Sequence, residues 1–153
     1  MSIFYPFEVE THLDIRQALS QMLEFLGIEP VLKPVGGGSP AIYGNGPHFT
    51  IYGLPRETPE DSLTEGLDLS PTIRLNFVVK LSSGDKAEED ILRGTVSWLH
   101  AYPDNCALLY YGEKVLFVRK EGKISINSNT DFWKPSFLEI LDLPYSKLPF
   151  DIL

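Results

Sequence analysis

The side chains that most often carry out chemistry, histidine and cysteine, are few and scattered in this sequence. His12, His48 and His100 lie in separate segments, and none has a second ligand at a metal-binding spacing such as H-x-x-x-H. Cys106, the only cysteine, belongs to the apolar run 106–111, where a thiol behaves as a small hydrophobe rather than as an exposed nucleophile. A disulfide within the chain is excluded. We therefore expect no metal, no cofactor and no catalytic residue.

Two further patterns could support chemistry but lack what that chemistry needs. Gly36-Gly37-Gly38 could offer backbone N–H groups to a phosphate, but Ser39-Pro40 follows where a P-loop requires Lys-Ser/Thr at the start of a helix. Adjacent carboxylates can share acid–base work only where their surroundings separate their pKa values. The pairs in this chain belong to segments that we expect to be solvated: Glu8/Glu10, Glu60/Asp61 and Glu88/Glu89.

One segment has a composition suited to binding another protein. Between residues 56 and 68 the chain carries five acidic residues and one basic residue, with leucines spaced among them. The acids could steer the segment toward a positive surface, and the leucines could add apolar contacts. The alternative is a solvated loop that its leucines hold against the rest of the chain. The residues predicted to bind a partner are Glu57, Glu60, Asp61, Leu63, Glu65, Leu67 and Asp68, and the alternative interface is Trp133 with Tyr145.

The elements that must position these residues follow from hydrophobic periodicity. Alternation over residues 3–9 predicts a strand, and Pro6 favours an edge position for it. An apolar stripe over residues 15–26 predicts a helix, with Asp14 as its cap and Gln17 three residues later. Alternation from Ile73 to Leu81 predicts a second long strand. A second long helix should begin near Asp85, with Glu88 completing a capping box, and should end before Pro103.

The remainder of the chain is rich in short strands. Gly112-Glu113 and Glu121-Gly122 can turn the chain twice, which predicts a meander over residues 106–111, 115–119 and 123–127. A short helix should follow over residues 137–141, with an extended tail after it. This order predicts an α+β fold, with a mixed, mainly antiparallel sheet, two main helices packed on one face and a C-terminal three-strand meander. No boundary divides the chain, so we expect a single domain over residues 1–153.

Composition limits the function. The chain has 153 residues, and its net charge of −8 argues against binding a nucleic-acid backbone. The same charge suits docking onto a basic partner. The N-terminus lacks the basic region and cleavage site of a signal peptide, and no apolar run approaches the roughly 20 residues that span a bilayer. We expect no membrane association and a cytoplasmic location.

An ordered series of short segments resembles the Sit-type immunity proteins, specifically the third of those families, which are associated with bacterial toxins delivered between kin cells. The segments are Gln17-Ala18-Leu19, Leu26-Gly27, Pro71-Thr72, residues 108–113, residues 115–119, Phe132-Trp133, Pro135 and Leu143-Pro144-Tyr145. The chain departs from that pattern near residues 36–38 and 57–68, where partner specificity could reside. The resemblance implies a non-enzymatic protein that binds and neutralises a cognate toxin, and it supplies no catalytic residues.

Two functions from different classes follow. The first is an immunity-type protein that binds its toxin, a basic nuclease being one candidate, through an acidic surface. The alternative is a small-ligand-binding or regulatory α+β module, whose ligand would occupy a pocket between helix and sheet.

Overall fold

The computed structural model describes residues 3–56, 66–111 and 114–150, and it places strands and helices close to where the periodicity of the sequence predicts them. In chain order these elements are β1 (Ile3–Val9), α1 (Ile15–Phe25), β2 (Lys33–Pro34), β3 (Ile42–Asn45), β4 (Phe49–Pro55), β5 (Ile73–Val79), α3 (Gly84–Ala101), β6 (Cys106–Tyr110), β7 (Lys114–Lys120), β8 (Lys123–Asn127), α4 (Pro135–Leu141) and β9 (Tyr145–Leu148).

The strands form one sheet in the order β2-β3-β4-β5-β1-β6-β7-β8-β9. Each described pair of neighbours is antiparallel except β8 and β9, which run parallel. The first strand of the chain, β1, therefore lies at the centre of the sheet, between β5 and β6. The predicted α+β class, with a mixed and mainly antiparallel sheet, is confirmed.

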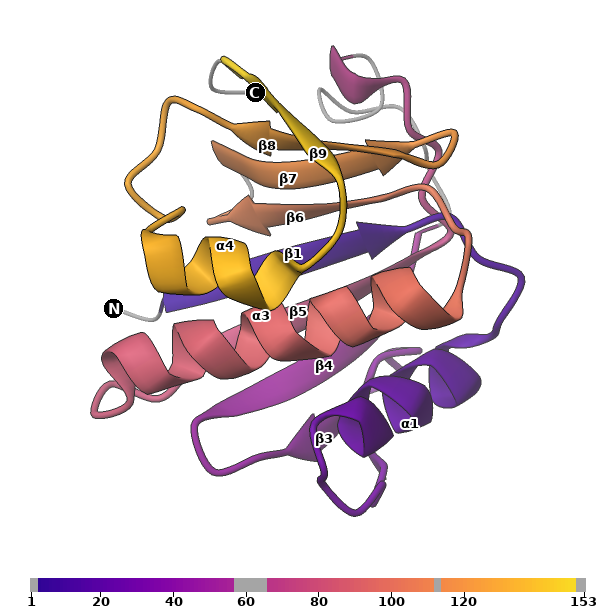
Figure 1. Ribbon diagram of the computed structural model, residues 1–153. Coiled ribbons are helices and arrows are strands. Elements are labelled where there is room, and N and C mark those ends of the chain that lie inside the picture. Colours follow the sequence, from indigo (N-terminus) through magenta and orange to yellow (C-terminus); the bar gives the residue numbers. More distant parts are fainter. Residues whose placement is uncertain (1–2, 57–65, 112–113, 151–153) are drawn as a thin grey trace.

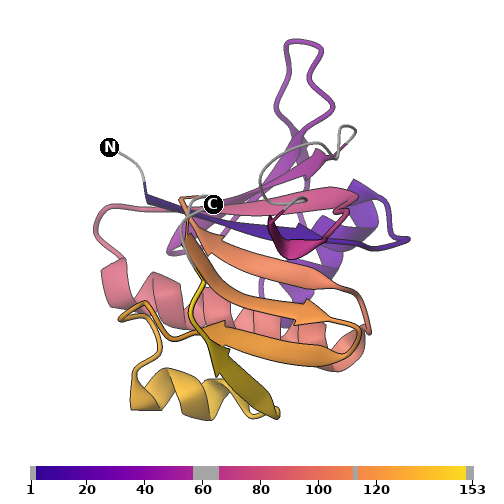
Figure 2. The ribbon, with the colours of Figure 1, turned by 90° about the horizontal axis from the view of Figure 1, so that it is seen from above.

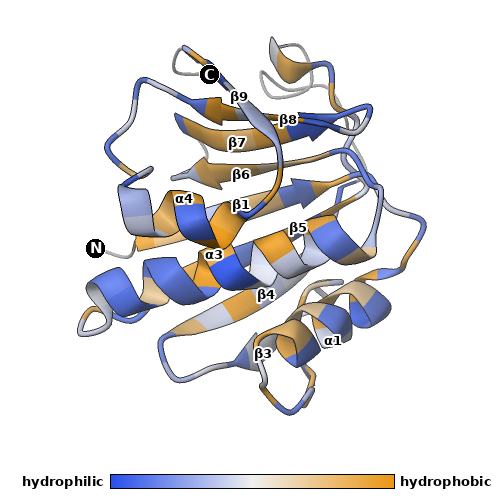
Figure 3. Ribbon diagram, viewed as in Figure 1, coloured by the Kyte–Doolittle hydropathy of each residue, from blue (hydrophilic) through white to orange (hydrophobic). Residues whose placement is uncertain are grey.

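The helices α1, α3 and α4 cover one face of this sheet, with α3 between the other two (Figure 1; Figure 2). Because α3 connects β5 to β6, it crosses β1, and the Trp98 ring of α3 meets Phe7 of β1 edge to face at 6.0 Å between centroids. A Cβ at Gly94 would lie 2.8 Å from Leu26 Cδ2, so the absence of a side chain lets α3 approach the end of α1. Hydrophobic residues run along β6, β7 and much of β1 under this layer (Figure 3).

The opposite face of the sheet is also partly buried. A small apolar cluster forms there from Leu69, Ala107, Leu109 and Val118, with Leu67 and Phe150 packed against it. Beside it, Glu8 is only 1% exposed and forms ion pairs with Arg56 and Arg74. A buried carboxylate requires such partners because its desolvation is otherwise too costly.

Pro6 does not mark an edge strand, so that prediction is wrong. Phe4 O accepts a hydrogen bond from Tyr111 N, and Glu10 N donates to Asn105 O, so the even-numbered residues of β1 direct their backbone polar groups toward β6 and its flanking residues. The ladder between β1 and β6 pairs only residues 7–9 of β1. Pro6 lies just outside it, where its missing N–H costs no ladder hydrogen bond.

The two long helices begin differently. At α1 the predicted capping box is present: the Asp14 carboxylate accepts from Gln17 N, and the Gln17 side chain accepts from Asp14 N. At α3 the predicted box is absent. The N-cap is Ser83, without a side-chain capping hydrogen bond, and Asp85 lies within the first turn. Glu88 therefore takes no part in capping α3.

The predicted C-terminal meander is confirmed as β6, β7 and β8, and it contains an irregularity. Leu108 faces Phe117 across the ladder while the next residue, Leu109, faces Val115, which leaves Leu116 as an extra residue in β7. This bulge lets the neighbours Leu116 and Phe117 both join the core under the helices. The proposed turn at Gly112-Glu113 lies outside the described residues.

Cys106 occupies the start of β6 and is fully buried, as predicted for a strand covered on both faces. Burial raises the pKa of its thiol to about 12. At neutral pH the side chain therefore stays a protonated, apolar group.

The tail is extended, as predicted, and it also joins the sheet. Residues 145–148 form β9, which pairs with β8 in parallel register and lies at one edge of the sheet. Pairing of this segment with β8 was not predicted from the sequence.

The turn between β7 and β8 provides a test of the backbone geometry. Glu121 has a φ of 52° and Gly122 a φ of 79°, the pair of positive angles that a type I′ turn requires. We expect Gly122→Val to lower the free energy of unfolding by about 1–3 kcal/mol, because a β-branched residue is strained there. Gly122→Asn, whose residue tolerates positive φ, should lose much less. Urea unfolding of both variants measures the difference, and equal midpoints would contradict the turn assignment.

Candidate binding surface

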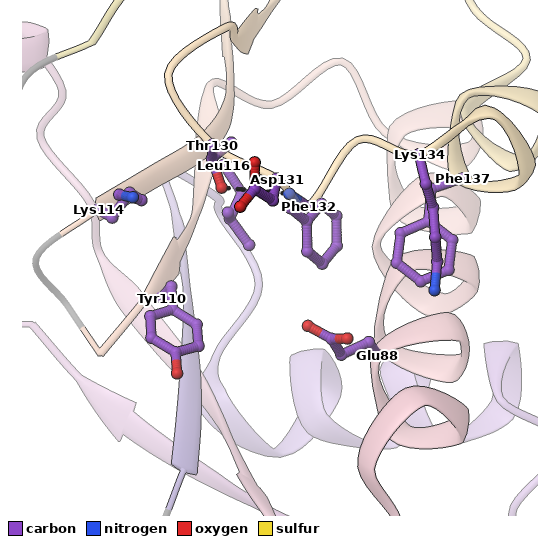
Figure 4. A pocket seen from close by; sticks show the side chains of 9 residues that line it. All are labelled: Glu88, Tyr110, Lys114, Leu116, Thr130, Asp131, Phe132, Lys134 and Phe137. Atoms are coloured by element: carbon purple, nitrogen blue, oxygen red, sulfur yellow. Dashed lines mark hydrogen bonds between the residues drawn. The ribbon is translucent and has the colours of Figure 1, made fainter.

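A hollow of about 410 Å³ lies between the first half of α3, the segment before α4, and the ends of β6 and β7. It lies on the helix-covered side of the sheet, and Figure 4 shows the side chains that line it. Its lining combines four charged side chains with aromatic and aliphatic ones: Glu88, Tyr110, Lys114, Leu116, Thr130, Asp131, Phe132, Lys134 and Phe137.

Glu88 is fixed by the central strand. It lies one turn into α3, and its Oε2 accepts a hydrogen bond of 2.6 Å from the hydroxyl of Tyr5, which is 3% exposed. Burial, and then the hydrogen bond and charge of Glu88, raise the pKa of Tyr5 well above its ordinary value. The phenol therefore stays protonated and keeps donating to the carboxylate.

The wall nearest β6 is Tyr110. Its ring meets Tyr5 edge to face at 5.3 Å between centroids. Burial raises the pKa of Tyr110, and the neighbouring Tyr111 and Glu88 add to that increase. Both phenols are thus neutral over the physiological range. Tyr5 is buried and already donates to Glu88, so of the two only Tyr110, which lines the hollow, can present its ring and O–H group to a partner.

The opposite wall is aromatic and carries a cation. Phe132 lies 5.0 Å from Phe137, between ring centroids, and the Lys134 ammonium lies 4.5 Å from the centroid of the Phe137 ring. Attraction of a cation to an aromatic face explains this position. In Figure 4 the Glu88 carboxylate points into the space between this wall and Tyr110.

Trp133 holds the segment before α4 in place. Its indole N–H donates a hydrogen bond of 2.8 Å to Leu116 O, the carbonyl of the extra residue in the β7 bulge. Its ring also lies 6.3 Å from Phe117 and 5.1 Å from Phe132, between centroids. The bulge thus supplies an acceptor, and the indole uses it to position one wall of the hollow.

The residues predicted to bind a partner do not line this hollow. Glu57, Glu60, Asp61, Leu63 and Glu65 lie outside the described residues. Leu67 is partly buried against the small cluster on the opposite face of the sheet. Asp68 has a 96% exposed side chain and pairs with Lys120 Nζ at 2.9 Å. Of the alternative interface, Trp133 is half-buried and adjoins the hollow, while Tyr145 is 39% exposed on β9.

The hollow was not predicted from the sequence, because Glu88 was assigned to a helix cap and to a solvated acidic pair. One signal was available. Glu88 precedes Ile91 and Leu92 by three and four residues, so it borders the buried stripe of α3. Tyr5, on the inward face of the first strand, is the buried donor that such a carboxylate can use.

The part of the chain that the structure describes lacks two other kinds of site. Within it, no group of three or more His, Cys, Asp and Glu side chains could hold a metal ion. None of its helices is both long and apolar enough to cross a membrane.

Comparison with known proteins identifies a family. A family model described as SitI3-like matches residues 3–137. The match extends from β1 into α4 and includes every residue that lines the hollow. No curated protein and no solved structure matches the chain.

The bulge contact predicts a specific loss of stability. Trp133→Phe keeps an aromatic ring but leaves the buried Leu116 carbonyl without its donor, which should cost about 1–3 kcal/mol of unfolding free energy. Tyr145→Phe, which removes only an exposed hydroxyl, should change that energy by less than about 0.5 kcal/mol. Thermal and urea unfolding measure both, and a Trp133→Phe protein as stable as wild type would contradict the contact.

Proposed function

Because the chain belongs to the SitI3-like family, we propose that it is an immunity-type protein that binds and neutralises a cognate bacterial toxin without catalysing a reaction. The family match over residues 3–137 is the observation that carries this proposal. Under this proposal, residues 1–153 act as one domain in the cytoplasm, where the protein meets the toxin.

Charge supports a basic partner. The chain has a net charge of −8, and complementary potentials speed association and exclude wrong partners. A basic nuclease fits this description, because an acidic inhibitor can occupy the site of its anionic substrate. We propose residues 57–68 as one docking segment of this surface, with Trp133 and Tyr145 as the alternative.

The hollow beside Glu88 favours a second candidate function, a small-ligand-binding or regulatory module. Its volume of about 410 Å³ is within the range of small-molecule sites, and polar groups converge on it. A module of this kind would bind its ligand whether or not a toxin is present, which separates the two candidates.

Co-expression tests the leading function. As the candidate toxin, the product of a neighbouring reading frame is expressed in a bacterial host with and without the chain. We expect toxin alone to stop growth, and the chain to restore growth and to co-purify with the toxin as a stable complex. If both proteins are expressed and growth still stops, the proposal is wrong.

The acidic segment can be tested with the same pair. Reversing Glu60, Asp61 and Glu65 to Lys should slow association with the toxin by about tenfold or more at low salt, with a smaller effect at high salt, because screening removes steering. Stability should change by no more than about 0.5 kcal/mol per site, because the sequence predicts a polar loop over these residues. Stopped-flow or surface plasmon resonance measurements give the rates.

A control with the same change in net charge makes the result specific. Glu24, Glu29 and Glu139 are exposed acids elsewhere on the chain, so their reversal to Lys has the same effect on total charge. We expect this control to slow association less. If both triple variants associate equally fast, residues 57–68 are not the docking segment.

A further inference from the structure

Among the described residues Glu88 has no cationic partner, unlike its neighbours Glu89 and Asp90. Glu89 pairs with Lys86 at 3.1 Å and with Arg93 at 3.7 Å, and Asp90 pairs with Lys86 and lies near His48. Among the described residues Glu88 forms no ion pair, and its hydrogen bond with Tyr5 uses one of about four acceptor positions on the carboxylate. A partly buried carboxylate with unused acceptors favours a cation supplied from outside the chain.

The walls around Glu88 suit the same kind of group. The rings of Tyr110 and Phe132 line the same hollow as the Glu88 carboxylate (Figure 4), and the Lys134 ammonium already lies against the Phe137 face. A planar guanidinium can stack on such rings while it donates two hydrogen bonds to one carboxylate. A lysine ammonium can satisfy the charge but not the stacking.

We infer that the hollow receives an arginine side chain of the partner protein, with Glu88 as its counter-ion and the rings of Tyr110 and Phe132 as its walls. This inference rests on the proposed function, since it assigns the anchoring contact of a basic toxin. Arginine is among the residues that most often carry the binding energy of an interface when they enter a pocket.

An anionic occupant fits the hollow less well. Lys114 and Lys134 also line it and could attract an anion, but an anion between them would face the unpaired Glu88 carboxylate and that of Asp131. Like charges at short range oppose binding. The ammonium of Lys134 is also engaged on Phe137.

A small probe tests the site without the toxin. N-acetyl-arginine amide is titrated into the full chain while amide NMR signals are followed, and N-acetyl-citrulline amide serves as a neutral analogue of nearly the same shape. We expect the arginine compound to shift signals from residues 84–92 and 130–137 in a saturable way, with affinity in the millimolar range. The citrulline compound should bind at least tenfold more weakly.

Matched variants identify the residue responsible. Glu88→Gln can still accept the Tyr5 hydrogen bond but carries no charge, and it should weaken binding of the arginine compound at least tenfold. Glu89→Gln, one residue further along α3, should bind as wild type does. Lys134→Met removes a competing cation and should bind more tightly, which keeps the test informative even if Glu88→Gln were to unfold.

Several outcomes would overturn the inference. They are the absence of saturable shifts in wild type, equal binding of the citrulline compound, unchanged binding by Glu88→Gln, and tighter binding of N-acetyl-glutamate amide than of the arginine compound. Failure of the proposed function has a different signature, because the chain would then not restore growth in the presence of the toxin. If the chain restores growth but the hollow does not bind the arginine compound, only this site is rejected and the proposed function stands.

Discussion

Burial of both faces of the central strands is the constraint on which the rest of the structure depends. Neighbouring residues of β1 point to opposite faces, and Phe7 and Glu8 are both almost fully buried. The three helices can cover only the face that holds Phe7. The other face is covered by Leu69 and Phe150, and by the ion pairs that bring Arg56 and Arg74 to Glu8. Segments on both sides of the sheet therefore depend for their packing on β1, a strand near the start of the chain.

A local irregularity in β7 borders the hollow, because its extra residue, Leu116, belongs to the lining. Helix α3 packs against both α1 and α4, and the bulge shifts the register in which β7 pairs with β6. Trp133 donates to the carbonyl of the bulge and so ties the segment before α4 to β7. The space that remains is bordered by Glu88, which Tyr5 fixes from the central strand. The hollow thus lies between α3, the segment before α4 and the strands β6 and β7.

Much of the fold could be predicted because local pattern and tertiary structure agree along most of the chain. The stripe of α1 and its capping box, the alternation of β5, and the meander each appear where periodicity and turn residues place them. Three features were not predictable in this way. Pro6 suggested an edge strand, but β1 lies at the centre of the sheet, and Pro6 is tolerated there because the ladder with β6 pairs only residues 7–9. The tail gave no sign of pairing with β8, because a parallel partner is distant in sequence. Asp85 and Glu88 have the spacing of a cap, but the helix begins earlier.

The sequence by itself determined the class of the fold, the absence of recognisable catalytic and metal-binding motifs, the acidic character of the chain and its resemblance to a family of immunity proteins. These properties depend on composition and short-range spacing, which can be read along one chain. Tertiary structure alone decided the order of the strands, the position of β1 at the centre and the meeting of Glu88 with Tyr5, which is 83 residues distant in sequence. Those outcomes depend on which faces are buried together. Burial is a property of the packed whole, and no local pattern in the chain specifies the partner that covers a given face.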